Sequence, residues 1–172
     1  MRVGLVSDLH GRFDPLLPKV LRGVELIVLA GDTVDEALLG RLREIAPVHA
    51  VRGNNDHSPG LLALPEFAEL VVAGVRILVA HDRKDRRLPA AIARSRPNVL
   101  VVGHSHQPLL VKEGDLLIVN PGGAGPRRFR LPRTAGTMTL APGRRPRVSL
   151  WDLDRDARYP LALCRREVAI GP

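Results

Sequence analysis

Seven side chains of the kinds that bind metal ions lie within the first 106 residues of this 172-residue sequence. Four are histidines and three are aspartate or asparagine, and nearly every one follows a short apolar run. Imidazole nitrogens with carboxylate and amide oxygens, and no thiolate, favour Mn, Fe, Zn, Ni or Co over copper(I) or an iron–sulfur cluster. Seven donors are enough for two ions. The residues are Asp8, His10, Asp32, Asn54, His81, His104 and His106.

The spacing of the first three residues suits a shared site. Asp8 and His10 are two residues apart directly after the apolar run 3–6, so both side chains can turn toward one ion where the strand ends. Asp32 follows the run 26–30 and Gly31. Its carboxylate has two oxygens and can bridge two cations held roughly 3.5–4 Å apart, the separation found in two-metal hydrolases.

The last two histidines follow a glycine. Gly103 comes after the apolar run 99–102 and frees the backbone for a sharp turn. His104 and His106, two residues apart, can then reach either ion. Asn54 adds a neutral amide oxygen.

These residues require strands that end close together, and the apolar patterns predict them. Strand and helix alternate early in the chain, and strands follow one another later. Two turns, 73–74 and 113–115, are typical of hairpins. The predicted strands are 2–7, 24–30, 47–52, 67–72, 75–80, 98–102, 108–112, 115–119, 136–140, 148–153 and 161–169. The predicted helices are 15–22, 35–45 and 87–96.

Several acidic residues have a structural interpretation instead of a chemical one. Asp35 precedes a helical pattern and fits a helix N-cap, and Asp14 before Pro15 fits the same role for the first helix. We expect Asp56 to form hydrogen bonds inside its own loop. His57 is more simply a residue outside the site than a group near the leaving group.

Composition favours one domain over residues 1–172. A hydrophobic content of 45% is sufficient for a core without a covalent staple, and Cys164, the only cysteine, excludes an internal disulfide. No apolar run is long enough to span a membrane, and no signal-like block opens the sequence. We therefore expect a soluble cytoplasmic protein.

The motifs DLH, GDTVD, GNND, a single His and GHSH, in this order, resemble the calcineurin-like metallophosphoesterase superfamily. The resemblance is closest to its small prokaryotic phosphodiesterase (YfcE-like) branch, covers about residues 1–125 and continues in NPGG at 120–123. It implies an α/β fold, a two-sheet β-sandwich flanked by helices. It also implies that one metal is bound by Asp8, His10, Asp32 and His106, and the other by Asp32, Asn54, His81 and His104.

By this resemblance the chain is a phosphodiesterase that depends on two divalent metal ions, manganese foremost. Two ions lower the pKa of a bound water toward about 7, so that a metal-bound hydroxide attacks the phosphodiester. Metal charges of roughly +4, offset by Asp8 and Asp32, leave about +2, which suits hydroxide and a singly charged diester. A dianionic monoester fits this balance less well.

Two positions depart from the superfamily pattern. Asn55 stands where many members carry a His thought to help the leaving group, and it remains a donor that cannot release a proton. With Asp32 it is our candidate for a catalytic residue. Asp82 stands where the superfamily usually has Gly. Its carboxylate could reorient the loop after His81 or bind a ring nitrogen of a metal-binding histidine.

Other functions remain possible on the same fold. A phosphomonoesterase or dinucleotide polyphosphate hydrolase usually has Arg soon after GDxVD and His in the GNH motif, where this chain has Glu36 and Asn55. A non-catalytic interaction module, resembling a eukaryotic trafficking subunit, would lack some ligands, whereas all seven are kept here.

Positive charge is concentrated late in the chain. Residues 126–172 hold 11 Lys or Arg against 4 Asp or Glu, and the segment 126–150 holds seven arginines and no acidic residue. One interpretation is a solvated rim. The functional one is that Arg127 and Arg128 bind a phosphate oxygen of a small phosphodiester in a bidentate manner. Nucleic acid is a less favoured partner, because aromatic residues for base stacking make up only 3% of the chain.

Overall fold

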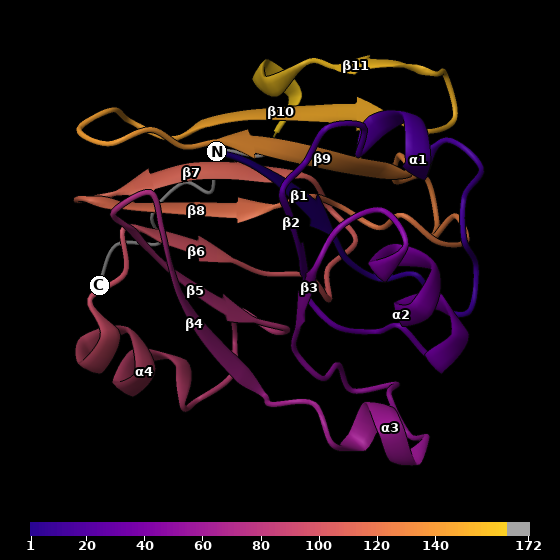
Figure 1. Ribbon diagram of the computed structural model, residues 1–172, viewed down its shortest axis with the longest axis horizontal. Helices are drawn as coiled ribbons and strands as arrows, with labels where there is room; N and C mark the ends of the chain where they lie inside the picture. The colour runs from indigo at the N-terminus through magenta and orange to yellow at the C-terminus, as the bar shows by residue number, and fades with distance from the viewer. Residues whose placement is uncertain (165–172) are drawn as a thin grey trace.

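The computed structural model describes residues 1–164, which form two β-sheets packed face to face with helices outside them (Figure 1). The six-stranded sheet has the order β11-β10-β9-β1-β2-β3 and the five-stranded sheet the order β4-β5-β6-β8-β7. The first contains β1 (Arg2–Val6), β2 (Leu26–Leu29), β3 (Val48–Ala50), β9 (Thr134–Thr139), β10 (Arg147–Asp152) and β11 (Ala157–Tyr159). The second contains β4 (Phe67–Val72), β5 (Val75–Ala80), β6 (Val99–Val101), β7 (Leu109–Glu113) and β8 (Leu116–Asn120).

The helices cover the outer faces of the sheets (Figure 1). One hydrophobic cluster joins the six-stranded sheet to α1, α2 and α3, and another joins the five-stranded sheet to α4. Among residues 1–164, no helix has the length and apolar character needed to span a membrane. The helical elements are α1 (Leu17–Val20), α2 (Glu36–Arg43), α3 (Pro59–Leu62), α4 (Leu88–Ser95) and the 3-10 helix η1 (Leu161–Leu163).

Alternation of side chains along each strand builds these layers. In β2, Leu26 and Val28 face the core between the sheets, whereas Ile27 and Leu29 face the helices. The same alternation divides β5 and β6 between the inner core and the layer beneath α4. Because every second residue points to the same face, a fully apolar run of this kind is the pattern expected for a strand buried on both faces.

Parallel pairing brings the functional loops together. β1, β2 and β3 pair in parallel, as do β5, β6 and β8. The arrowheads of β5, β6 and β8 accordingly point to the same side in Figure 1. Ligands of such α/β sheets bind outside the carboxyl ends of the strands, which is where the predicted metal-binding residues lie.

Most predicted strands are confirmed, with differences at their ends. The last predicted strand is wrong where it can be checked: 161–163 is a 3-10 helix, and 165–169 lies outside the described residues. The first helix is shorter than predicted, because Asp14 accepts a hydrogen bond from Leu16 N in a turn before the helix instead of capping it. Asp35 is the N-cap of α2, as predicted, since its carboxylate accepts from Ala37 N at 2.9 Å.

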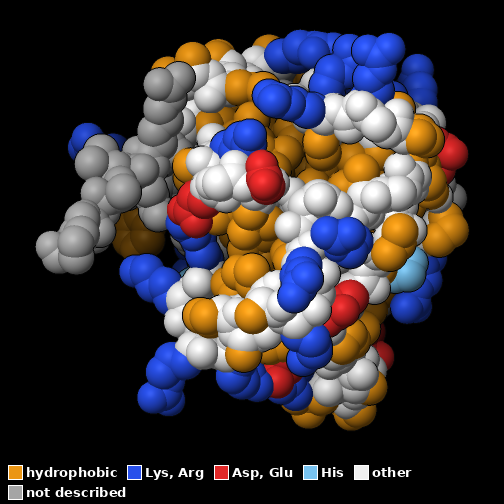
Figure 2. All heavy atoms as spheres, turned by 90° about the vertical axis from the view of Figure 1, so that its left-hand side faces the viewer, with side chains coloured by type: hydrophobic (Ala, Val, Ile, Leu, Met, Phe, Trp, Pro, Cys, Tyr) orange, Lys and Arg blue, Asp and Glu red, His pale blue; other side chains and the backbone are white. Residues whose placement is uncertain are grey.

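Figure 2 views the end of the molecule on the left of Figure 1, where the hairpin turns lie. Lys and Arg side chains gather at its upper edge, and hydrophobic side chains are visible below them. A hollow here is lined by residues in and beside three turns, including Lys112, Arg144 and Arg145. The basic segment 126–150 therefore reaches an end of the protein remote from the carboxyl ends of β5, β6 and β8.

Candidate metal centre

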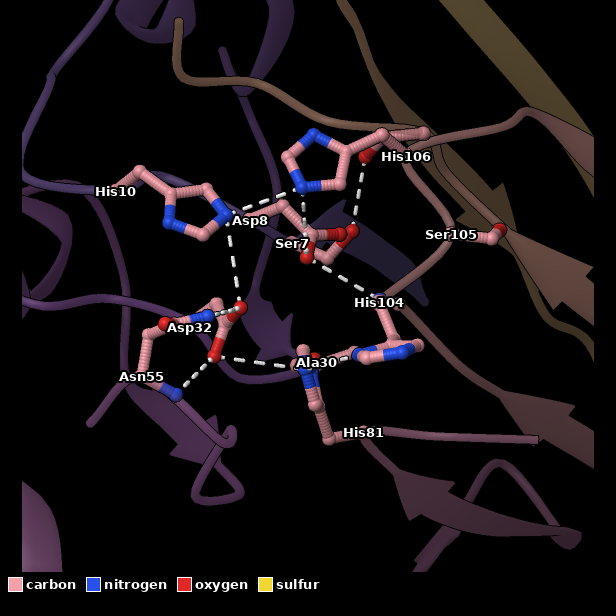
Figure 3. Close-up of polar contacts among 12 residues, drawn as sticks. Ser7, Asp8, His10, Ala30, Asp32, Asn55, His81, His104, Ser105 and His106 are labelled. Carbon is pink, nitrogen blue, oxygen red and sulfur yellow. Dashed lines mark hydrogen bonds and ion pairs between the residues drawn. The ribbon is translucent and has the colours of Figure 1, made fainter. Parts of the chain in front are cut away.

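The seven predicted metal-binding side chains come together where the strand-end loops of the two sheets meet, and Figure 3 labels all of them except Asn54. Backbone hydrogen bonds fasten these loops to one another. Asp8 N donates to Gly31 O at 3.0 Å and His10 N donates to Asp32 O at 2.9 Å, which joins the loops after β1 and β2. In the other sheet, Gly103 N donates to His81 O at 2.9 Å. The site is thus held by backbone contacts as well as by side chains.

One group of donors surrounds His10 and His106. Their Nε2 atoms are 3.0 Å apart, and the two rings are stacked with centroids 4.9 Å apart. His106 Nε2 lies 3.5 Å from Asp8 Oδ1, and His10 Nε2 lies 3.5 Å from Asp32 Oδ2. These are the four residues that the resemblance assigned to one ion.

A second group surrounds the amide oxygen of Asn54. This Oδ1 lies 3.0 Å from His81 Nε2 and 2.9 Å from His104 Nδ1. The two ring nitrogens are 3.3 Å apart, and His81 Nε2 lies 3.4 Å from Asp32 Oδ1. The two oxygens of Asp32 therefore face different histidines, one in each group.

The spacing of the donors fits divalent cations. With bonds of about 2.0–2.2 Å, ligands at tetrahedral or octahedral angles lie about 2.8–3.6 Å from one another. The distances within each group, 2.9 to 3.5 Å, fall in this range. Asp8 Oδ2 is buried and has no hydrogen-bond partner within residues 1–164, an arrangement that a bound cation would relieve. The residues present could hold two ions.

Five of the seven residues have left-handed backbone conformations, with φ between 44° and 66°. This region is unfavourable for residues with a Cβ atom and costs of order 1–3 kcal/mol each. Such strain persists where the surrounding structure enforces it, and it clusters at functional sites. The five are Asp8, His10, Asp32, His104 and His106.

Two glycines permit the close approach of the loops. A Cβ atom at Gly53 would lie 2.2 Å from Asp32 N and Asp32 Oδ1. A Cβ atom at Gly31, whose φ is +84°, would lie 2.5 Å from His81 Nδ1. The glycines of the GDTVD and GNND motifs are thus required for packing beside the candidate ligands.

Asn55 and Ala30 orient two of the donors. Asn55 N donates to Asp32 Oδ1 at 2.9 Å, and Asn55 Nδ2 donates to Asp32 Oδ2 at 2.7 Å (Figure 3). His81 Nδ1 lies 2.7 Å from the carbonyl oxygen of Ala30, so that Nε2 faces the site. A hydrogen bond from the second ring nitrogen to a carbonyl is the usual way in which a metal-binding histidine is oriented.

Asp56 lies behind the site and Asp82 beside it. Asp56 is buried and accepts hydrogen bonds from Gly53 N and Val34 N, each at 2.7 Å. The predicted hydrogen bond within its own loop is confirmed, and a second one reaches the loop after β2. Asp82 Oδ1 accepts from Lys84 N at 2.8 Å, which stabilises the turn after β5. His57 is exposed and does not line the cavities beside the candidate ligands.

The electrostatic environment shifts the pKa values of the two buried carboxylates in opposite directions. Burial raises the pKa of Asp8 to about 7. Burial also raises the pKa of Asp32, but hydrogen bonds and charge from His81 and hydrogen bonds from Asn55 outweigh it and hold this pKa well below its usual range. Without a metal, Asp8 thus retains its proton until the pH rises to about 7, whereas Asp32 is ionised throughout this range.

The histidines also differ. Burial, together with the positive charges of His10 and Arg128, lowers the pKa of His106 to about 4. Burial likewise lowers the pKa of His10. Burial opposes protonation of His81, but hydrogen bonds to Asp32 and the Ala30 carbonyl outweigh it and raise the pKa. His10 and His106 are therefore neutral near pH 7 and have lone pairs available for a cation.

Two cavities adjoin the candidate ligands, and they share Asn54 and His104. One, of about 290 Å³, extends over Phe67 and the ion-paired side chains of Glu66 and Arg87. The other, of about 240 Å³, is lined on its far side by Arg128, Phe129 and Leu131, and also by Ser105.

The structure separates the two arginines that the sequence singled out. Arg128 lines the 240 Å³ cavity with His10 and His106. Arg127 does not line it: its Nε donates to Leu131 O at 3.3 Å, and its Nη2 lies 3.7 Å from Asp154. Sequence reasoning missed Phe129, and the only available signal was a lone aromatic residue in an arginine-rich loop after NPGG.

A sequence profile of the calcineurin-like phosphoesterase superfamily domain matches residues 1–143, which include all seven candidate ligands. The chain belongs to this superfamily. As a calcineurin-like phosphoesterase it is a metal-dependent phosphoester hydrolase, and the predicted superfamily is confirmed.

Two relatives of this calcineurin-like phosphoesterase are prokaryotic. A probable metallophosphoesterase of Methanocaldococcus jannaschii is 34% identical over 134 residues, with 71% of this chain and 67% of the relative covered. The phosphodiesterase YfcE of Escherichia coli K12 is 29% identical over 148 residues, with 71% of this chain and 78% of the relative covered. These likenesses agree with the predicted branch of the superfamily.

The fold recurs in Vacuolar Protein Sorting 29 from Cryptosporidium parvum. Its structure matches this calcineurin-like phosphoesterase with a TM-score of 0.77 and covers 92% of this chain and 94% of the other. The identity is 19%, so the likeness concerns the fold alone. The predicted two-sheet sandwich flanked by helices is confirmed.

Proposed function

We propose that this chain is a phosphodiesterase that uses two divalent metal ions. The observation that carries the proposal is the position of Asp32, whose Oδ2 lies 3.5 Å from His10 Nε2 and whose Oδ1 lies 3.4 Å from His81 Nε2. A carboxylate with one oxygen turned toward each set of histidines is suited to bridge two cations. The sequence similarity to the phosphodiesterase YfcE of Escherichia coli also supports the proposal.

The cavities support a diester as the substrate. The candidate ligands lie between spaces of about 290 and 240 Å³, and each space could receive one ester group of a phosphate held at Asn54 and His104. The net charge of the metal centre also favours a diester. Two divalent cations offset by Asp8 and Asp32 leave about +2, which matches a nucleophile and a monoanionic diester.

Two bound divalent ions would supply an activated water and neutralise charge on the reacting phosphate. The side chains of the chain itself orient the reactants. Asn55 fixes the carboxylate of Asp32 through two hydrogen bonds. Arg128 offers a guanidinium at the cavity wall for a phosphate oxygen. Because the amide of Asn55 cannot release a proton, diesters with good leaving groups are expected to react fastest.

Substitution of Asp32 tests the proposal. Asp32→Asn removes one negative charge from between the two histidine groups, so we expect the bound metal to fall from two ions to one or none. Diesterase activity should fall by more than the roughly 10–100-fold loss that is typical when a residue hydrogen-bonded to a metal ligand is replaced. Metal content is measured by elemental analysis and turnover with bis(p-nitrophenyl) phosphate in the presence of Mn²⁺, Ni²⁺ or Zn²⁺.

Asp35→Asn is the matched control. It makes the same change in the same GDTVD motif, and asparagine is an equally good helix N-cap. This variant should keep both ions and its activity. Full turnover by Asp32→Asn would show that the bridging role is wrong, and faster hydrolysis of p-nitrophenyl phosphate than of the diester would favour a phosphomonoesterase.

A non-catalytic interaction module is the second candidate, because the fold is shared with Vacuolar Protein Sorting 29. The same measurements separate the two functions. A module of this kind would hydrolyse neither diester nor monoester with any of the metals, whatever its metal content.

A further inference from the structure

Phe129 is in an unusual position for a large apolar residue. Its side chain is 93% exposed, the largest exposed fraction among the large hydrophobic side chains described in residues 1–164. It occupies the second position of a turn closed by a hydrogen bond from Leu131 N to Arg128 O at 3.1 Å. Its φ is +51°, a conformation that turns usually assign to Gly or Asn. Neither packing nor backbone preference accounts for phenylalanine here.

The segment that carries Phe129 is held at both ends, and one of these ends is bonded to the loop of the candidate ligand Asp8. On one side Gly125 N donates to Asp8 O at 3.0 Å. On the other, the half-buried Arg133 pairs with Asp14 and Asp154, at 2.6 and 2.7 Å. The turn at 128–131 is therefore held beside the candidate ligands while the phenyl ring is left in solvent.

The ring borders the cavity of about 240 Å³ that also contacts His10, Asp32 and His106. Arg128 lines the same cavity. A phosphate at the metal centre would thus have a guanidinium and an aromatic ring on the side where one of its ester groups extends into this cavity. A cavity of this size can accommodate a planar ring and the atoms that link it to phosphorus.

We infer that Phe129 stacks on a planar aromatic ring in the ester group that stays on phosphorus when the other leaves, so that the preferred substrates are aryl or nucleoside phosphodiesters. The inference rests on the proposed phosphodiesterase function and names its substrate class. An exposed ring contributes nothing to the folded state but gains contact area when a second ring covers it. One such ring suits a single base or aryl group, whereas a polymer is bound by successive aromatic side chains.

Three substrates with the same leaving group provide the test. Methyl, phenyl and thymidine 5′ esters of p-nitrophenyl phosphate all release p-nitrophenolate, so they differ only in the second ester group. We expect the native protein to have a KM about tenfold lower for the phenyl and thymidine esters than for the methyl ester, the effect of one stacking contact. A low KM for the thymidine ester alone would mean that Phe129 selects a nucleobase. A low KM for both the phenyl and the thymidine ester would mean that it accepts any aryl group.

Variants separate the ring from its backbone. Phe129→Gly removes the ring and also relieves the left-handed conformation, so it should abolish the KM preference while the midpoint of thermal unfolding stays the same or rises. Phe129→Trp should retain the preference. Val71→Ala, at an exposed apolar residue of β4, is the control and should also retain it.

Two results would overturn the inference and leave the phosphodiesterase proposal intact: equal KM values for the three esters, and a KM preference that persists in Phe129→Gly. A protein that hydrolyses none of the esters would instead contradict the proposed function, and stacking is then tested by binding. In that case phenyl phosphate and methyl phosphate are titrated into the zinc-loaded protein by calorimetry, and equal affinities exclude stacking. A tenfold difference that Phe129→Gly removes would uphold it.

Discussion

At the scale of single residues, burial of Asp8 makes the stability of the metal-free protein depend on pH. Burial raises its pKa to about 7 from an ordinary value of 3.8, so above pH 7 the folded chain carries a buried carboxylate that the unfolded chain would expose to water. A carboxyl with a raised pKa favours folding at low pH, and this contribution is lost as the pH rises from 3.8 through 7, the pKa of the folded state. A cation at the site would pair with the carboxylate and remove the penalty.

This linkage predicts that metal stabilises the fold more at high pH. The pKa of His81 is also raised, and its contribution likewise falls as pH rises through that pKa. The lowered pKa values of His10 and His106 act below pH 6.5, and that of Asp32 below pH 3.8. Between pH 6.5 and 8 only the first two effects operate, so the rise in the midpoint of thermal unfolding on adding Mn²⁺ should be larger at pH 8.

Scanning fluorimetry with and without Mn²⁺ at the two pH values makes this measurement. Asp8→Asn is the informative variant, because its neutral amide has no carboxyl proton to lose in this range. In the metal-free state its unfolding midpoint should fall less than that of the native chain between pH 6.5 and 8. A metal-induced rise that is the same at both pH values would contradict the role of Asp8.

At the scale of elements, the long-range contacts between loops determine the site, and Asp56 joins two of them. Its carboxylate accepts from Val34 N and from Gly53 N, so it connects the loop that carries Asp32 to the loop that carries Asn54. Val34 is β-branched and has a φ of +69°, an unfavourable conformation that this hydrogen bond helps to hold.

Asp56→Asn should loosen both loops. Since one carboxylate oxygen becomes an NH₂ group facing a backbone N–H, about 1–3 kcal/mol of stability should be lost. For a chain of this size, that lowers the midpoint of thermal unfolding by roughly 2–12 °C. Affinity for Mn²⁺ should fall as well, measured by calorimetry. Asp115→Asn, the same change in the exposed turn between β7 and β8, should alter neither quantity, and an Asp56→Asn protein of native metal affinity would limit Asp56 to folding.

The elements also show what the sequence could predict. The inner strands β1, β2, β5 and β6 were predictable because each contains an apolar run buried on both faces. Six of the seven candidate ligands were predictable because they lie just after these runs, whereas Asn54 follows the three-residue strand β3. By contrast, β11 and α3 have three and four residues, too few to show a period, and tertiary contacts hold them in place. The position of Phe129 beside the cavity depends on the pairing of β9 with β1, a contact between distant segments.

At the scale of the whole molecule, the structure divides the basic segment that the sequence presents as one. Its first arginines lie near the metal centre, where Arg128 lines a cavity. The later ones, Arg144 and Arg145, line the hollow at the turn between β9 and β10. The six residues of β9 separate the two groups by about 20 Å. Positive charge therefore lies at two ends of the molecule, whereas a bound polynucleotide needs one continuous track.

This division predicts weak binding of nucleic acid with a shallow dependence on salt. A protein that neutralises six to ten phosphates loses about 10³–10⁵ in affinity between 50 and 200 mM salt. Contacts confined to the surroundings of Arg128 should involve one or two phosphates, so we expect a loss of about tenfold or less. The measurement is competition by a single-stranded oligonucleotide against hydrolysis of a nucleoside p-nitrophenyl diester at both salt concentrations. Arg144→Ala with Arg145→Ala should leave the competition unchanged, because these side chains lie at the other end of β9. Tight competition that this double variant weakens would instead mean that a polynucleotide binds along β9 to both groups of arginines. Small diesters would then occupy only part of the substrate-binding site.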